Sequence, residues 1–399
     1  MVERRDTVNR ESEAFEMIAR LENAGHEAYI VGGSLRDRLL GREAYDIDMT
    51  TSALPEETVS IFSDMRVIPT GIKHGTVTVL APSGAPVEIT TFRTDGSYSD
   101  SRHPDSVTFT RSLPDDLARR DFTVNAMAFS PRRGVIDLFG GREDLEVGLI
   151  RCVGQPEKRF SEDALRILRA FRFSAQLGFS IEGETYRAAI KLGHKITDLA
   201  RERVASELIK LLSAPAVAAV LEDMMPIMTY VLPEAVMEKK SIALCDRLSS
   251  DPILRLAMLI YDGDSEGVAR SLKLSTADKN RLCRLSAPRK ELRSEADARR
   301  LMAELSSKDD CIQSVIVSRL AEDKDPSDEI RLIESAANGS PCLTIADLAV
   351  DGESLMSAGV QKGRQMGAVL HRLLDTVIED PSLNNKETLL EMARAWGNG

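Results

Sequence analysis

The sequence predicts an α+β protein, in which an N-terminal domain with a mixed sheet and helices precedes an all-helical remainder. Strand and helix patterns alternate from Ala28 to about residue 140, whereas helical periodicity dominates beyond Arg151. Aromatic residues make up 5% of the chain, with a single Trp, which disfavours an all-β sandwich. We expect four parts, at residues 1–150, 151–215, 216–335 and 336–399.

The length and the charge of the chain limit what it can bind. Its 399 residues are enough for two to three domains at about 150 residues each. Acidic residues outnumber basic ones by 63 to 52, so the net charge of −11 excludes a protein that binds polyanions over its whole surface. Contact with nucleic acid therefore needs a local basic region. Residues 151–210 form such a region, with twelve Lys and Arg against eight Asp and Glu.

Cysteine usage and hydropathy indicate the compartment. The five cysteines are scattered and none forms a CxxC pair, which predicts neither a disulfide framework nor a zinc site. A reducing cytoplasm is the expected location. No apolar segment follows the basic N-terminus, and the most apolar stretch, residues 211–232, is interrupted by Pro215 and Pro226. We expect no signal peptide, no membrane span and no membrane partner, while the oligomeric state stays uncertain.

The elements of the N-terminal domain follow from periodicity and from turn residues. Apolar residues at helical spacing predict a helix over residues 12–24, which ends at Gly25. The run from 94 to 114 is rich in Ser, Asp and Pro and is expected to form a loop. Strands are expected at residues 28–33, 47–50, 75–81 and 87–92.

The first chemical signal is VGGSLRDRLLG, which places Gly32 and Gly33 between a strand and a helix. Paired glycines let backbone N–H groups approach a phosphate, and the start of a helix adds a favourable dipole. Arg36 can supply a charged donor to the same anion. The alternative is an ordinary tight turn.

The second signal is the sequence DID, which places Asp46 and Asp48 two residues apart on a strand, so that both side chains share a face. Two such carboxylates repel each other unless a cation lies between them, and oxygen ligands favour Mg²⁺. Glu88, in the strand VEITTF, is a candidate third carboxylate from a neighbouring strand. The alternatives are a solvated strand edge for the aspartates and an outward-facing position for Glu88.

The third signal is RRDFTVNAMA, which begins with Arg119 and Arg120. Adjacent arginines at the end of a strand or loop can bring a guanidinium group to an anion. Asp121 and Asn125 can hold that group or a ribose hydroxyl. The alternative is a pair of surface charges.

The fourth signal is SEDALRILRAFRF, residues 161–173, which predicts a helix capped by Ser161. Glu162 and Asp163 suit the positive N-terminal end of such a helix. Asp163 and Arg166 lie three residues apart and would be neighbours on one face, a spacing that is also typical of a salt-bridge ladder over an apolar core.

An Asp acceptor beside an Arg donor also complements particular base edges. Cytosine and adenine both present an amino donor next to a ring-nitrogen acceptor, whereas guanine and uracil present the reverse order and would leave a buried carboxylate facing a carbonyl. Asp163 and Arg166 could therefore select C and A. Arg169 lies next along this face, but regular helical geometry rotates Arg172 to the side opposite Asp163.

In their order and spacing, these motifs resemble those of the class II tRNA nucleotidyltransferases, the bacterial CCA-adding enzymes of the polymerase-β superfamily. The resemblance covers about residues 28–212 and includes VGGSLRDRLLG with DID, VEITTFRTDG, RRDFTVNAMA, DLFGGRED, EDALRILRAFRF and RERVASELIKLL. It implies a polymerase-β-like nucleotidyltransferase head, followed by a helical neck, a body and a tail that binds tRNA. The implied activity is the addition of C, C and A to the 3′ acceptor end of tRNA from CTP and ATP, without a nucleic-acid template.

The resemblance also implies roles for residues. Asp46 and Asp48 would bind two Mg²⁺ ions, one activating the attacking 3′-hydroxyl of tRNA and the other stabilising the pyrophosphate that leaves the α-phosphate. Asp163 and Arg166 would read the base. The implied nucleotide-binding residues are Gly33, Arg36, Arg120, Asp163, Arg166, Arg169 and Arg172. The implied supporting residues are Gly32, Ser34, Asp121, Asn125 and Glu162.

Three narrower activities share such a head, namely A-only addition, CC-only addition and poly(A) polymerisation. The poly(A) enzymes tend to carry a strongly basic C-terminal extension, whereas this chain ends in EMARAWGNG. CC-only relatives resemble a version shortened between DID and RRDF, whereas residues 95–116 look full-length here. An A-adding enzyme, a poly(A) polymerase relative and a non-catalytic RNA-binding protein of the same fold stay open as alternatives.

Overall fold

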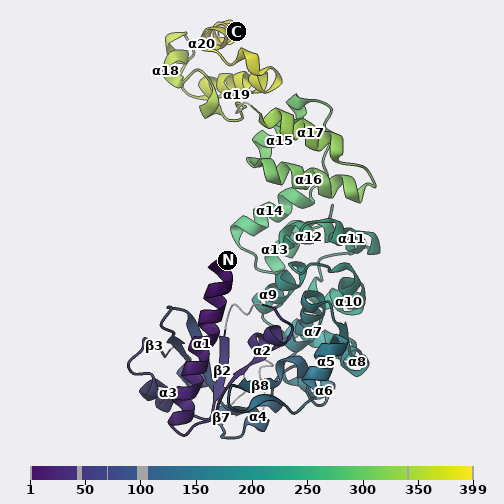
Figure 1. The fold of residues 1–399 in the computed structure, drawn as a ribbon. Helices are drawn as coiled ribbons and strands as arrows, with labels where there is room; N and C mark the ends of the chain where they lie inside the picture. Colours follow the sequence, from purple (N-terminus) through teal and green to yellow (C-terminus); the bar gives the residue numbers. More distant parts are fainter. Residues whose placement is uncertain (1, 43–46, 70, 97–106, 339–340, 398–399) are drawn as a thin grey trace. The chain divides into compact units, whose positions relative to one another are not determined.

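The computed structural model describes residues 2–42, 47–69, 71–96, 107–338 and 341–397 (Figure 1). The chain forms two compact units, Met1–Pro233 and Glu234–Gly399. The first unit contains the sheets and the second unit is helical over its described residues. The predicted order, a sheet-containing N-terminal domain followed by a mostly helical remainder, is confirmed.

A mixed seven-stranded sheet forms the centre of the N-terminal domain. Its strand order is β3-β4-β5-β2-β1-β8-β9, in which β2 and β5 run parallel and the other neighbouring pairs run antiparallel. The parallel pair lies in the middle of the sheet, where the two predicted carboxylate-bearing strands meet. The strands are β1 (Ala28–Val31), β2 (Ile47–Thr51), β3 (Val67–Ile68), β4 (Thr76–Leu80), β5 (Pro86–Thr91), β8 (Met127–Ser130) and β9 (Gly134–Asp137).

Helices cover both faces of this sheet. The strand β1 is therefore buried on both sides, and its residues are apolar. Tyr29 and Val31 pack against Leu113 and Leu117 of α4 on one face. The helices α1, α2 and α3 contact other parts of the sheet (Figure 1). The bounds are α1 (Val2–Asn23), α2 (Gly32–Leu39), α3 (Pro55–Ile61), the 3₁₀ turn η1 (Ile72–His74) and α4 (Leu113–Ala118).

The segment from 94 to 114 contains regular structure at both ends, so the predicted loop is wrong there. β6 (Arg93–Asp95) pairs antiparallel with β7 (Val107–Phe109), and α4 begins at Leu113. The residues between these strands, 97–106, lie outside the described residues. Short pairings of this kind come from contacts distant in sequence, and local composition does not reveal them.

Helices dominate the rest of the first unit, but one strand pair departs from the all-helical prediction. β10 (Leu149–Ile150) pairs parallel with β11 (Ser180–Ile181). The strand β11 has only two residues, too few for a recognisable alternation. The other elements are the 3₁₀ turn η2 (Thr123–Asn125), α5 (Gly141–Val147), α6 (Pro156–Glu162), α7 (Leu165–Leu177), α8 (Gly183–Leu192), the 3₁₀ segment η3 (Gly193–Asp198), α9 (Arg201–Leu212) and α10 (Ala218–Val231).

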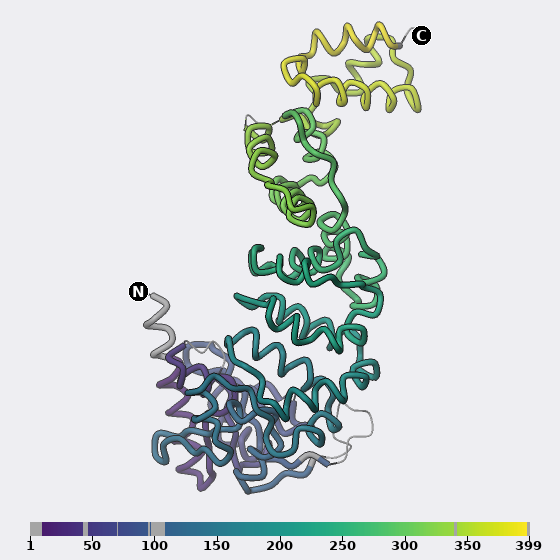
Figure 2. The backbone as a smooth tube through the Cα atoms, turned by 90° about the vertical axis from the view of Figure 1, so that its right-hand side faces the viewer, coloured from purple at the N-terminus to yellow at the C-terminus, as the bar shows by residue number. Residues whose placement is uncertain are grey.

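The described residues of the second unit include two apolar cores that are separate from each other. One core joins α15, α16 and α17, and the other joins α18, α19 and α20. Figure 2 shows α19 and α20 side by side near the C-terminus, as their mutual packing requires. The helices are α11 (Lys239–Leu244), α12 (Pro252–Leu259), α13 (Ser265–Ser271), α14 (Thr276–Ser286), α15 (Glu295–Leu305), α16 (Lys308–Ala321), α17 (Ser327–Ala337), α18 (Gly352–Ser357), α19 (Arg364–Glu379) and α20 (Lys386–Gly397); the 3₁₀ turns are η4 (Cys245–Arg247), η5 (Ile345–Asp347) and η6 (Pro381–Leu383).

The structure also bears on the predictions about membrane spans and cysteines. None of the described helices is both long and apolar enough to cross a membrane. All five cysteines are free, and four of them are buried.

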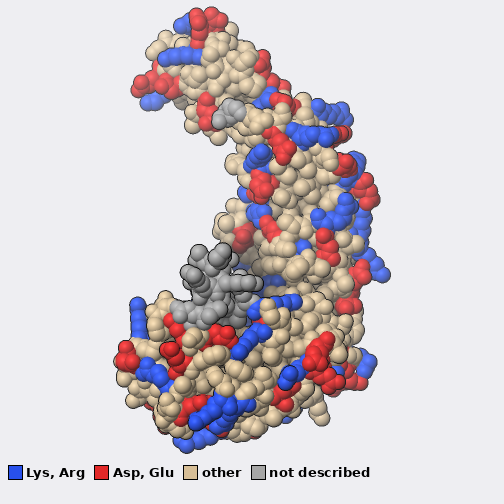
Figure 3. Space-filling view, viewed as in Figure 1, with Lys and Arg blue, Asp and Glu red and all other residues tan. Residues whose placement is uncertain are grey.

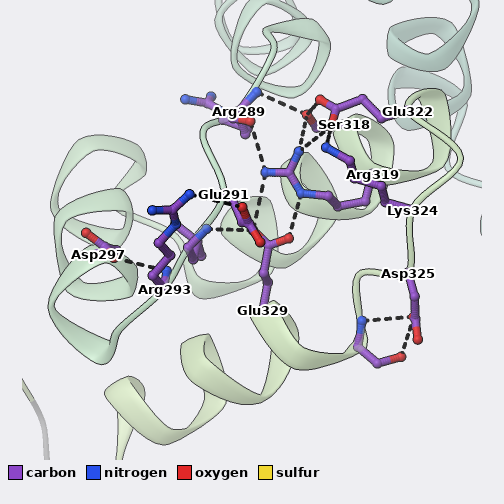
Figure 4. A network of polar contacts seen from close by, with 12 residues as sticks. Arg289, Glu291, Arg293, Asp297, Ser318, Arg319, Glu322, Lys324, Asp325 and Glu329 are labelled. Atoms are coloured by element: carbon purple, nitrogen blue, oxygen red, sulfur yellow. Dashed lines mark hydrogen bonds and ion pairs between the residues drawn. The ribbon is translucent and has the colours of Figure 1, made fainter.

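A buried ion pair connects α16 and α17 (Figure 4). Arg319 Nε donates to Glu329 Oε1 at 2.6 Å, and both side chains are less than a tenth exposed. Arg319 Nη2 also donates to the backbone oxygen of Arg289 at 2.9 Å, and the backbone N–H of Leu292 donates to Glu329 Oε2 at 2.9 Å. The pair therefore fixes the loop before α15 as well as the two helices.

Removing Glu329 is expected to destabilise this region strongly. Glu329→Ala leaves the guanidinium of Arg319 buried without its main counter-charge, which costs about 3–5 kcal/mol. The measurement is hydrogen exchange of the amides of α16 and α17, together with urea unfolding. The control is Asp328→Ala on the same helix, whose carboxylate is 86% exposed. Equal protection of these amides in the two variants would contradict the prediction.

Candidate active site

A cavity of about 510 Å³ in the first unit gathers most of the predicted site residues. Eight arginines and three aspartates line it, although the net charge of the chain is −11. On the face shown in Figure 3, by contrast, acidic and basic side chains are interspersed. The cavity therefore fits an anionic ligand. The charged lining residues are Arg36, Arg93, Arg119, Arg120, Arg166, Arg169, Arg172, Arg203, Asp48, Asp121 and Asp163.

The N-terminus of α2 forms one wall of the cavity. Gly32 has a φ of +70°, in the left-handed region that favours glycine. A Cβ at Gly32 would lie 3.4 Å from Arg120 Nη1 and 3.6 Å from Asp48 Oδ2, so both side chains converge on this turn. Gly32 and Gly33 both line the cavity. The first backbone N–H groups of a helix lack intrahelical acceptors, so this wall suits a phosphate.

Asp48 brings a carboxylate to the cavity from the exposed start of β2. The register of the parallel strands β2 and β5 pairs Asp48 with Glu88, so the two side chains leave the same face of the sheet. Glu88 is exposed and is not among the described residues that line the cavity. Ser34 lies behind the strand, where its hydroxyl donates to Val31 O at 2.9 Å and accepts from the backbone N–H of Asp48 at 3.4 Å.

The donor chemistry at this edge fits a hard divalent cation, because carboxylate oxygens are the ligands that such cations prefer. Within the ranges that the structure describes, no three Asp, Glu, His or Cys side chains gather closely enough to hold a metal ion. Asp46, the other carboxylate of the DID motif, lies outside the described residues. Asp48 is thus the described carboxylate that combines an exposed position with a place in the cavity wall.

A buried carboxylate absent from the sequence analysis holds the arginine pair. Asp116 of α4 is fully buried, and it accepts from Arg119 Nη2 at 2.8 Å and from Arg120 Nη2 at 3.2 Å. Thr50 of β2 donates to the same carboxylate at 3.2 Å. Burial raises the pKa of Asp116, but the two guanidinium groups outweigh it and keep the pKa below its usual range. The i, i+3 and i, i+4 spacing in DLARR was the available signal.

Asp121 and Asn125 connect an arginine of α2 with an arginine of α7, both of which line the cavity. Asp121 Oδ2 accepts from Arg169 Nε at 2.7 Å and from its Nη2 at 2.6 Å. Asn125 Nδ2 donates to Asp121 Oδ1 at 3.3 Å, and Asn125 Oδ1 accepts from Arg36 Nη1 at 2.9 Å. This chain of contacts ties α2 to α7 through η2.

The Asp121 pair is expected to make stability depend on pH. Burial raises the pKa of Asp121, but Arg169 lowers it further, to about 2. An unfolded Asp has a pKa of about 3.9, so the pair stabilises the fold fully above about pH 4 and loses this effect as the pH falls toward 2. Asp121→Asn should therefore cost roughly 2 kcal/mol at neutral pH and progressively less below pH 4.

Urea unfolding of both proteins between about pH 2 and 6 measures this difference. Asp115→Asn, at an exposed position of α4, is the control. A difference between wild type and Asp121→Asn that does not vary with pH would contradict the assignment.

The helix predicted to begin at Ser161 is in fact two helices. α6 ends at Glu162 and α7 begins at Leu165, with Asp163 extended between them at φ −143° and ψ 105°. Ser161 therefore lies within α6 and caps nothing, and Glu162 lies at a C-terminal end. Asp163 Oδ1 accepts from the backbone N–H of Leu165 at 2.9 Å, which satisfies a free donor at the start of α7 and favours the break.

The predicted base-reading residues, Asp163 and Arg166, lie at this break, and each side chain is held by residues outside the pair. Asp163 Oδ2 accepts from Arg203 Nη2 of α9 at 3.0 Å. Arg166 Nη1 donates to Glu162 Oε2 at 2.7 Å, and Arg166 Nη2 donates to the backbone oxygen of Arg119 at 3.2 Å. Both side chains line the cavity, so an acceptor and a donor are held in it with fixed orientations.

Arg172 also lines the cavity, so the predicted rotation away from the site is wrong. The rotation was counted from Asp163, which lies outside α7. Within α7, Arg166, Arg169 and Arg172 are three residues apart and span about 120° of the helix circumference. Arg172 Nε donates to Glu207 Oε2 of α9 at 2.6 Å. Burial lowers the pKa of Arg172, and Glu207 partly opposes that effect.

Comparisons with known proteins agree over most of the chain. Residues 28–151 match the profile of the poly A polymerase head domain, and residues 178–237 match a profile described as a probable RNA and SrmB-binding site of polymerase A. Residues 253–393 match the putative domain 2 of tRNA nucleotidyltransferases. The CCA-adding enzyme of Ligilactobacillus salivarius is 34% identical over 96% of this chain and 95% of its own length. This chain belongs to the family of CCA-adding enzymes.

Other CCA-adding enzymes extend the comparison. That of Leuconostoc mesenteroides is 52% identical over 206 residues, about half of each chain. The crystal structure of the Bacillus stearothermophilus CCA-adding enzyme in complex with CTP superposes with a TM-score of 0.82 and 32% identity over 96% of each chain. The predicted family and fold are confirmed, and the CCA-adding enzymes are nucleotidyltransferases.

The sequence motifs of this CCA-adding enzyme did not predict every residue of the cavity wall. Arg93, Arg203 and Phe173 line the cavity but were not among the predicted site residues. Arg93 and Arg203 lie in VEITTFRTDG and RERVASELIKLL, two motifs of the resemblance in which no arginine was predicted to have a role. Phe173 looked like an ordinary apolar residue of an amphipathic helix.

Proposed function

We propose that this protein adds C, C and A to the 3′ end of tRNA, with CTP and ATP as substrates and without a nucleic-acid template. The observation that carries the proposal is one cavity that combines Asp48, a cluster of arginines and the pair Asp163 and Arg166. Such a cavity can accept a nucleoside triphosphate whole, with its base at one end and its phosphates near a carboxylate edge. The CCA-adding activity in the names of the relatives supports the same reaction.

The proposed cofactor is Mg²⁺, held by Asp48 together with Asp46. When bound, it supplies positive charge to the reacting phosphates and lowers the pKa of the attacking hydroxyl. The chain's own groups bind the rest of the nucleotide. We assign the triphosphate to the backbone N–H groups at Gly32 and Gly33, because the start of a helix attracts anions. The arginines of α2 and α7 would donate charge-assisted hydrogen bonds to the same phosphates.

Base selection follows from hydrogen-bond complementarity between the base and the side chains of Asp163 and Arg166. The carboxylate of Asp163 already accepts from Leu165 and Arg203, and a carboxylate has about four acceptor positions, so it can also accept from the amino group of C or A. Arg166 has donors for the neighbouring ring nitrogen. Guanine or uracil would place a carbonyl against Asp163, which is costly in a buried site.

Glu88 is proposed as a catalytic carboxylate beside Asp48, supported by their paired register. Glu88→Gln keeps the shape and removes the charge, and we expect transfer to fall by about 10- to 100-fold with CTP affinity unchanged. Single-turnover rates at saturating CTP measure the effect. The control is Glu56→Gln, an exposed residue of α3. A rate equal to wild type would contradict this role and favour the alternative, in which Glu88 is an outward-facing strand residue.

The decisive experiment for the function is incorporation of labelled CTP and ATP into tRNA that lacks its 3′ end, in the presence of Mg²⁺. We expect two C residues and then one A. No incorporation by folded protein favours an RNA-binding protein of the same fold. Incorporation of A only into tRNA ending in CC, or a long A tail on arbitrary RNA, favours the narrower activities. Each of these outcomes overturns the proposal.

The domain limits, the part of the chain that binds tRNA and the cytoplasmic location of the protein stay predictions. The limits near residues 215 and 335 and the assignment of residues 336–399 to tRNA binding came from helical periodicity and from the resemblance. The cytoplasmic location came from the cysteine pattern. Crosslinking of tRNA to the full chain, with the attached peptides identified, tests the assignment of the tail.

A further inference from the structure

Three arginines of the cavity gather around one aromatic ring. The guanidinium carbons of Arg172, Arg169 and Arg36 lie 4.0, 5.1 and 5.2 Å from the ring centroid of Phe173. All three distances are within the range of cation–π attraction. Arg36 comes from α2 and the other two come from α7, so the ring contacts arginines of both helices.

Each of these guanidinium groups is also held along one edge by a carboxylate. Arg36 bonds Asp37, Arg169 bonds Asp121 and Arg172 bonds Glu207. An edge contact leaves a planar group free to rotate about that edge, and a ring against its face removes this freedom. A guanidinium has five N–H donors, so donors remain in its fixed plane after the carboxylate contact.

A ring suits this position better than another carboxylate. Phe173 attracts cations through the negative face of its π system but carries no net charge. It therefore offsets the mutual repulsion of three neighbouring cations without neutralising them. An acidic side chain here would reduce the positive charge that an anionic ligand needs.

The ring itself is fixed by the motif that follows the arginine pair. Phe122, directly after Asp121, is fully buried and contacts Phe173 edge to face, with centroids 5.8 Å apart and planes at 82°. Phe173 is 6% exposed and lines the cavity. The cluster is thus anchored in both the N-terminal domain and α7.

We infer that Phe173 is a positioning residue for the triphosphate, which sets the orientation of Arg36, Arg169 and Arg172. The inference rests on the proposed function for the identity of the ligand. It assigns no role in base choice to Phe173, because the arginines gathered around its ring are Arg36, Arg169 and Arg172.

The test compares the dissociation constant of CTP and the inhibition constant of tripolyphosphate in wild type and Phe173→Leu. Leucine keeps an apolar side chain and removes the ring. We expect both constants to rise by about 10-fold or more. At saturating CTP the transfer rate should fall by less than about 3-fold, since the lost interaction is made with the bound triphosphate throughout. The preference for CTP over UTP should not change.

Two further variants separate positioning from a general loss of structure. Phe171→Leu changes the same residue type two positions away, where the ring is fully buried against Tyr186, and should keep the affinity for tripolyphosphate. Phe173→Tyr keeps the ring face and should stay within about 3-fold of wild type. If Phe173→Leu does not fold, Phe173→Met removes the ring with a more adaptable side chain.

Three results would overturn the inference: wild-type affinity for tripolyphosphate in the folded variant without the ring, an equal loss in Phe171→Leu, or a change in base preference alone. Binding of CTP and tripolyphosphate is measured without RNA. Failure of the incorporation assay therefore overturns the proposed function, whereas unchanged binding in Phe173→Leu overturns this inference.

Discussion

Replacing Asp48 by Asn is expected to reduce nucleotide transfer by about 1000-fold or more. The substitution keeps the size of the side chain and removes the negative charge, and a bound metal ion contributes several kcal/mol of transition-state stabilisation that depends on that charge. The affinity for CTP should change far less, because the arginines and the N-terminus of α2 remain. Single-turnover incorporation of labelled CTP into tRNA, with CTP binding measured separately, distinguishes the two effects.

The control for this prediction is Asp64→Asn, an exposed residue of the same unit that bonds Arg20. It should transfer nucleotides at the wild-type rate. Asp46→Ala, at the other position of the DID motif, should abolish transfer as Asp48→Asn does. A rate within about 10-fold of wild type in Asp48→Asn would remove this carboxylate from the proposed metal site.

Replacing Arg166 by Ala is expected to relax the choice of base while some transfer persists. A site that hydrogen-bonds its substrate rejects analogues through the groups left unpaired, and loss of one such group should lower the preference for CTP over UTP by about 100-fold. The ratio of kcat/KM for CTP and UTP, measured with the same tRNA, gives the effect. Absolute rates should fall as well, because Glu162 keeps only Arg159 of its two arginine partners and the base is held less firmly.

Arg187→Ala provides the matched control, since this arginine of α8 is 67% exposed and bonds Glu184 on the surface. It should leave both the rate and the preference unchanged. An unaltered CTP preference in Arg166→Ala would contradict the assignment of base reading to Asp163 and Arg166. A second variant, Glu162→Gln, keeps Arg166 but weakens its orientation, so its loss of preference should be smaller.

The arginine-rich cavity also explains how a protein with a net charge of −11 can bind an anion. Most lining arginines have a fixed acidic partner, such as Asp116 for Arg120 and Asp121 for Arg169. Both of these acids are buried. The arrangement fixes the direction of the donors, and the excess of arginines over aspartates in the wall supplies the positive potential.

The sequence predicted several features because each depends on residues that are close together in the chain. The strands β1, β2 and β5 followed from short runs of strand-forming residues, and the close approach at Gly32 followed from the glycine pair. The register of Asp48 with Glu88 agrees with the proposed neighbouring strands. The order of the motifs also carried the family, since a set of short patterns in one order is far more specific than any one of them.

Only the tertiary structure determined how these pieces meet. The break at Asp163 depends on a hydrogen bond to Leu165 and an ion pair with Arg203, forty residues away, and propensity alone favoured one continuous helix. The same break places Arg172 in the cavity. Asp116, Glu207 and Phe173 acquire their roles from partners on other elements, so local sequence marks them only as an acid on a helix or an apolar core residue. Chemistry that resides in a short motif can be read from the chain, whereas the orientation of each charged group depends on contacts that form only on folding.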